Sequence, residues 1–153
     1  MNGYLLIKWI HVLMAITALG ANITYGLWLA RADKEPQYLA FALRGVKALD
    51  DRVANPAYGI LLLTGIAMVY LGRIPWSTPW LFTGLILYVI LVVIAAAGYT
   101  PALRRQIASL DAGGPDSPEY QALAARSARL GILLGIIAVI IVFMMVTKPT
   151  LWG

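Results

Sequence analysis

The sequence predicts an all-α integral membrane protein, a bundle of four helices with both chain ends on the outer side of the membrane. Of its 153 residues, 61% are hydrophobic and 12% are charged. The apolar residues form four long blocks, and most Lys and Arg residues fall in two of the three connections. A water-soluble domain of this length could not bury so much apolar surface. We therefore expect one transmembrane domain over residues 1–153.

The four apolar blocks are long enough to cross a bilayer. A spanning helix needs about 20 apolar residues, and a helix satisfies its backbone groups internally, as lipid requires. The predicted spans are 4–30, 55–71, 80–99 and 130–147. The first block stays apolar too far to be a signal peptide, so we interpret it as a retained span.

The distribution of basic residues predicts the orientation of the spans. The first and third connections carry Arg31, Lys34, Arg44, Lys47, Arg52, Arg104, Arg105, Arg126 and Arg129. The positive-inside rule places these connections in the cytoplasm, so both termini face outward. Four tryptophans fall near the predicted outer boundary, where indole rings anchor helices among headgroups. They are Trp9, Trp76, Trp80 and Trp152.

Each cytoplasmic connection has helical character of its own. In the first, apolar residues recur at helical spacing over 37–53 between charged ones, which predicts an interfacial amphipathic helix. Pro36 is expected to begin it and Asn55-Pro56 to end it. In the third, residues 111–118 are dense in turn-forming residues and are expected to separate helical extensions of the third and fourth spans.

One face of the first span carries polar residues. Lys8, His11, Asn22 and Tyr25 are joined through Ala15 and Ala18 in steps of three and four residues. Because polar groups are costly in lipid, this face should point into the bundle. Two interpretations remain open: interhelical hydrogen bonding, and a ligand or cofactor site.

His11 is the single histidine of the chain, and it lies in the outer half of the first span. In an antiparallel bundle, the end of the fourth span lies at the same depth, which brings Met144, Met145 and Lys148 near it. A His11–Met145 pair could ligate haem. Alternatively, the methionines fill gaps between helices, and Lys8 and Lys148 extend to the headgroups.

Other chemistry finds little support in the residues. The chain has no cysteine, no catalytic residue set and no metal-ligand spacing. Asp50 and Asp51 are neighbours that point about 100° apart on a helix, so capping or pairing with Lys47 and Arg52 is expected. The basic residues lie beside apolar spans, which favours the lipid bilayer over nucleic acid as the partner.

Three segments resemble a known family. Leu5 to Leu13, Asp51 to Gly65 and Met144 to Pro149 are similar to predicted bacterial integral membrane proteins without assigned function, DUF2269. The resemblance implies four spans in a bacterial cytoplasmic membrane. More distantly, Lys8 and His11 in the first span resemble four-helix, haem-associated proteins of the oxygen-independent protoporphyrinogen oxidase and copper-resistance D families.

The sequence favours a non-enzymatic role as a small subunit or accessory of a membrane complex. Its partners would then be other membrane subunits or further copies of this chain. The first alternative is a haem-binding redox protein that uses His11. The second is a transporter of a small solute or lipid, which the absence of Asp and Glu from the spans makes the weakest of the three.

Overall fold

The computed structural model describes residues 3–151, so Trp152 of the predicted tryptophan belt lies outside the described residues. The described chain is helical and contains no strand. Its elements are α1 (Gly3–Ala32), η1 (Pro36–Tyr38), α2 (Leu39–Leu49), η2 (Asp50–Ala54), α3 (Asn55–Leu71), α4 (Pro79–Ile94), η3 (Ala95–Tyr99), α5 (Thr100–Gly113) and α6 (Pro118–Thr147). The predicted all-α class is confirmed.

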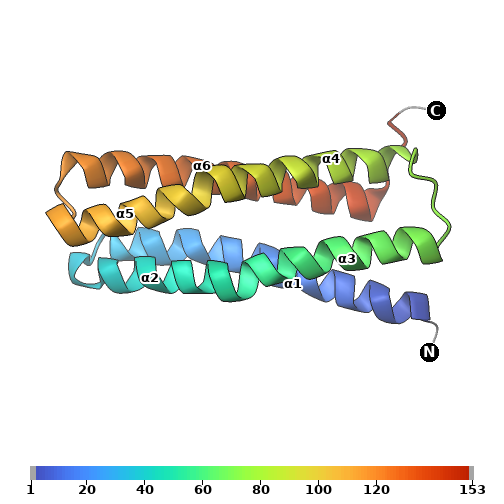
Figure 1. Ribbon diagram of the computed structural model, residues 1–153, viewed down its shortest axis with the longest axis horizontal. Helices are drawn as coiled ribbons and strands as arrows, with labels where there is room; N and C mark the ends of the chain where they lie inside the picture. The colour runs from blue at the N-terminus through green and yellow to red at the C-terminus, as the bar shows by residue number, and fades with distance from the viewer. Residues whose placement is uncertain (1–2, 152–153) are drawn as a thin grey trace.

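These elements join into long helical rods. Four are long and apolar enough to cross a membrane: Gly3–Ala32, Pro36–Leu71, Pro79–Gly113 and Pro118–Thr147. The prediction of four spans is therefore confirmed. In Figure 1 the rods lie side by side along the long axis, and α1 begins at the same end of the molecule at which α6 finishes.

Two prolines that would ordinarily interrupt a helix are accommodated inside these rods. Pro56 follows the π-helical segment η2, and Pro101 follows the π-helical segment η3. Proline lacks an amide hydrogen and crowds the carbonyl four residues earlier. A π-helical turn moves the hydrogen bonds to the residue five positions away, which relieves this conflict. The helix predicted to end at Asn55-Pro56 therefore continues without a break from α2 into α3.

The predicted amphipathic helix over 37–53 is represented by α2 and most of η2. Its apolar face packs within the bundle, where Leu39, Leu43 and Val46 are buried. Contacts with α1 and α5 cover this face, because α2 continues the α3 rod instead of turning away from it. Its position at the membrane surface stays a prediction.

The rods are longer than a bilayer is thick. Rods of 30 to 36 residues extend roughly 45 to 54 Å at about 1.5 Å per residue, against about 30 Å of hydrocarbon. We call the end that contains α2, η2, α5 and the first turns of α6 the inner half. The outer half contains α3, α4 and the remaining turns of α6. The names follow the predicted orientation.

The connection between α5 and α6 lies at the tip of the inner half. Gly114 ends α5 with a φ of 75°, a value that L side chains rarely adopt. Ser117 then caps α6, because its hydroxyl accepts a hydrogen bond from the Tyr120 amide at 3.2 Å. The turn predicted over 111–118 is found at residues 114–117, because α5 continues to Gly113, and a helix lies on each side as predicted.

Candidate functional site

Two hydrogen bonds between side chains link the polar face of α1 to α3. The Nδ1 atom of His11 lies 2.9 Å from the hydroxyl of Thr64. Further along α1, toward the inner half, the Asn22 amide donates to the Tyr58 hydroxyl at 2.5 Å. Both partners come from the rod that packs most closely on α1. These two side chains therefore face α3 and not the surrounding lipid.

The other two residues of the predicted face behave differently from each other. Tyr25 is buried, and its hydroxyl has no hydrogen-bond partner within residues 3–151. Lys8 is exposed near the start of α1. The face is thus turned inward at His11, Asn22 and Tyr25, whereas Lys8 points away from the bundle.

The surroundings of His11 determine which of its ring nitrogens carries the proton. The Thr64 hydroxyl has one hydrogen, which it donates to the backbone carbonyl of Ile60 at 2.7 Å or of Leu61 at 3.1 Å. With that hydrogen used, the hydroxyl offers Nδ1 of His11 an acceptor, and the Leu61 carbonyl is a second acceptor for the ring. We infer that neutral His11 is protonated on Nδ1 and that its Nε2 atom keeps its lone pair.

Two glycines make room for the side chains that meet here. A Cβ at Gly65 would lie 3.1 Å from the Cε1 atom of His11. A Cβ at Gly84 would overlap the terminal methyl group of Met145. The His11 imidazole therefore packs against α3 and the Met145 thioether against α4, each at a position where glycine leaves room for it.

His11 and Met145 line one cavity in the outer half of the bundle. Its volume is about 110 Å³. The wall is built largely from aliphatic residues of α3, α4 and α6, with Trp76, Trp80 and Tyr88 as its aromatic members. The Tyr88 hydroxyl donates to the Tyr58 carbonyl at 2.8 Å, so its hydrogen is already used. The acceptors that remain on the cavity lining include the lone pair on Nε2 of His11 and the hydroxyl oxygen of Tyr88.

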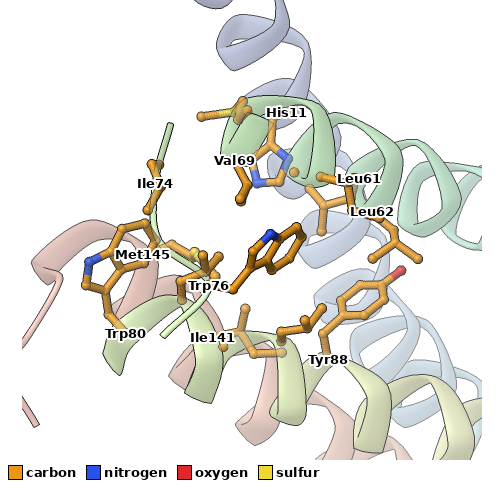
Figure 2. A pocket seen from close by; sticks show the side chains of 16 residues that line it. His11, Leu61, Leu62, Val69, Ile74, Trp76, Trp80, Tyr88, Ile141 and Met145 are labelled. Carbon is orange, nitrogen blue, oxygen red and sulfur yellow. The ribbon is translucent and has the colours of Figure 1, made fainter. Parts of the chain in front are cut away.

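Trp76 lies between the two polar ends of this cavity. Figure 2 shows its indole between His11 and Tyr88, with Trp80 and Met145 on the far side. Trp76 belongs to the connection between α3 and α4, is 44% exposed, and makes an edge contact with Tyr70 at 5.9 Å. Beside it, the Lys148 ammonium lies 5.2 Å from the centre of the Trp80 ring. The outer end of the cavity is therefore aromatic, and a cation lies beside Trp80, which is one of its lining residues.

Sequence reasoning identified His11 and Met145 but missed the residues that complete the site. Thr64 and Tyr88 are polar residues inside apolar spans, and that position was the signal that could have identified them. Gly84 carried no signal by itself. The partners of these residues depend on which helices are neighbours, which hydropathy does not specify.

The acidic pair in the inner half is divided between two environments. Asp51 forms an ion pair with Lys47, as expected. Asp50 is buried, and the Asn55 amide nitrogen lies 3.5 Å from its carboxylate. Within residues 3–151, no group of three or more His, Cys, Asp or Glu residues could hold a metal ion.

Four apolar rods with a small cavity between them define a multi-pass helical membrane protein. The family model described as "Predicted integral membrane protein (DUF2269)" matches residues 5–149. The chain belongs to this family, as the resemblance of its segments implied. No curated protein and no solved structure matches the chain.

Proposed function

We propose that this protein is a non-enzymatic membrane protein that binds a small aromatic molecule carrying a hydrogen-bond donor in the cavity at His11. The observation that carries the proposal is the fixed imidazole: Thr64 occupies Nδ1, which leaves the Nε2 lone pair in a largely apolar cavity. Pockets with apolar walls and a few polar groups are typical binding sites. A hydroxyl or N–H on the ligand would satisfy Nε2.

The Trp76 indole indicates the shape of the ligand. It is a planar ring system with one N–H donor, and it lies between His11 and Tyr88 (Figure 2). Because Trp76 stands on an exposed connection, it could swing out and leave a ring-sized space. A molecule with a similar ring and one donor would take its place.

Haem is the second candidate, because His11 and Met145 line the same cavity. The ligand types fit, because imidazole and thioether both bind haem iron. In His11, Thr64 holds Nδ1 and leaves Nε2 as the ligand atom. The space does not fit. A volume of about 110 Å³ is well below the ~300 to 1,000 Å³ of pockets that enclose drug-sized ligands, and a porphyrin is at least that large. Haem would require α3 and α4 to separate further.

A binding titration tests the proposal. The purified protein in mild detergent is titrated with 1-naphthol and with naphthalene, which has the same rings without the hydroxyl, and tryptophan fluorescence is recorded. One net hydrogen bond predicts roughly 2- to 12-fold tighter binding of 1-naphthol. The variant His11→Phe should remove this preference. Equal binding of the two probes to the natural protein would reject the proposal.

A variant that fills the cavity distinguishes probe binding in the cavity from non-specific uptake of the probe by the micelle. Gly84→Leu places a side chain where Met145 sits and should abolish binding of both probes. Gly20→Leu is the matched control, because a Cβ at Gly20 meets no atom within 4 Å. Probe binding that survives Gly84→Leu unchanged would place the site elsewhere.

Two further measurements separate the remaining alternatives. An absorption spectrum after haem-replete expression that shows a Soret band, lost in His11→Ala, would replace the proposal with the haem function. Mass analysis of the particle in mild detergent would reveal a partner subunit. The roles as an accessory subunit and as a transporter stay predictions, as do the bacterial cytoplasmic membrane and the outward termini.

A further inference from the structure

The rods α3 and α4 follow each other in the chain but do not pack together. No pair of Cα atoms from these two fully described helices lies within 8 Å. The hydrogen bond from the Tyr88 hydroxyl to the Tyr58 carbonyl crosses the space between them. A hollow lies on each side of this bond. The His11 cavity is on the outer side, and a second, larger hollow is on the inner side.

The inner hollow changes in character along its length. We call it the inner groove; its volume is about 720 Å³, within the ~300 to 1,000 Å³ typical of ligand pockets. Toward the middle of the bundle its wall is aliphatic, with Leu62, Val89, Val92 and Val93. Toward the inner half the wall becomes polar, with Asp51, Asn55, Thr100 and Arg104. One molecule that fills it must be apolar at one end and polar at the other.

The polar end of the inner groove carries one carboxylate, on Asp51, and one guanidinium group, on Arg104. Asp51 is already neutralised by its ion pair with Lys47. Arg104 is exposed and takes part in no ion pair or hydrogen bond with residues 3–151. A guanidinium group binds phosphate oxygens through two parallel hydrogen bonds, which gives it both charge and shape complementarity to phosphate.

We propose that the inner groove binds a phospholipid of the membrane leaflet on the side of the inner half. Its phosphate lies on Arg104 and one acyl chain lies along Val89, Val92 and Leu62. The aliphatic wall and the basic end lie in the order in which a lipid presents its chain and its phosphate. The exposed valines of α4 leave the groove open toward the acyl chains of the surrounding lipid. A second helix in this place would fill the aliphatic part but would leave Arg104 without an anion.

Gly59 provides a way to close the groove without disturbing the bundle. It lines the groove on α3, and a Cβ at this position meets no atom within 4 Å. A leucine there would extend into the space assigned to the acyl chain. It would also be more favourable than glycine in a helix, so misfolding is not expected. The variant Gly26→Leu is the matched control, since Gly26 also meets no neighbour and lies outside the groove.

The test is native mass spectrometry of the purified protein in mild detergent, titrated with phosphatidylglycerol or with a diacylglycerol of the same chains. We expect one phosphatidylglycerol to be retained and diacylglycerol to be retained at least tenfold less. Arg104→Gln should weaken phosphatidylglycerol binding about tenfold, the lower value expected for a hydrogen bond to a charged group. Arg105→Gln, its exposed neighbour outside the groove, should leave binding unchanged. Gly59→Leu should abolish retention.

Several outcomes would overturn the lipid site. These are equal retention by Arg104→Gln and Arg105→Gln, equal binding of diacylglycerol, and full displacement of the lipid by millimolar inorganic phosphate. A dimer that Gly59→Leu dissociates would identify a second copy as the occupant instead. The site is independent of His11, so Arg104→Gln should bind 1-naphthol as the natural protein does, and failure of one proposal leaves the other standing.

Discussion

In the inner half of the bundle Leu43 and Leu103 have no exposed surface, whereas Leu63 in the outer half is 68% exposed. Most of the fully buried side chains belong to α2, α5 and their neighbours, as in a water-soluble helical bundle. The outer half turns its aliphatic side chains toward lipid and keeps a cavity between its helices. The inner half holds the helices together, which leaves the outer half free to enclose a ligand.

The largest expected effect comes from removing a core side chain of the inner half. Leu103→Ala should lower the free energy of unfolding by about 2 to 5 kcal/mol, because the cavity left in a packed core cannot collapse fully. Leu63→Ala is the matched control. It should lower the free energy of unfolding by less than about 1 kcal/mol, because Leu63 contacts lipid or detergent in both the folded and the unfolded protein. The measurement is an unfolding titration in micelles followed by circular dichroism. Equal losses would remove the distinction between the halves.

An intermediate effect is expected at the histidine of the outer half. Thr64→Val keeps the shape of the side chain but removes the partner of Nδ1, which should cost about 1 to 3 kcal/mol. Thr17→Val is its control, because within residues 3–151 the Thr17 hydroxyl donates to the Leu13 carbonyl of its own helix and to no other helix. Nitrogen NMR of His11 gives a second measurement. The natural protein should be protonated on Nδ1, and Thr64→Val should lose that preference. An Nε2-protonated ring in the natural protein would contradict the assignment.

The sequence predicted the helices more completely than their packing. The second span, predicted over 55–71, has the bounds of α3, because the segment from Ala57 to Leu71 is predominantly apolar. Pro56 was misleading: as a helix breaker it predicted an end to the preceding helix, and a π-helical turn absorbed it. A proline is visible in the sequence, but the rearranged hydrogen bonds that accommodate it are not.

The candidate site was predictable only in part for the same reason. Equal depth in an antiparallel bundle was enough to bring His11 and Met145 to one cavity. The partner of His11 required knowing that α3 is the close neighbour of α1, and the inner groove required knowing that α3 and α4 stand apart. Hydropathy reports whether a segment is apolar but not which helix it contacts. From the sequence, Arg104 at the basic end of the groove was therefore counted only among the basic residues that predict the orientation of the spans.

The smallest effect is expected from the ion pair between Arg44 and Asp111, which joins α2 to α5 at 2.6 Å on the surface of the inner half. Both side chains are about half exposed or more, so water and salt screen their attraction. A double-mutant cycle with Arg44→Gln and Asp111→Asn should give a coupling energy of about 0.2 to 1 kcal/mol, falling as salt is added. A coupling as large as the loss in Leu103→Ala would mean that charge, and not the buried core, holds the inner half together. The stability difference between the halves would then depend on ionic strength, which the packing of Leu43 and Leu103 does not predict.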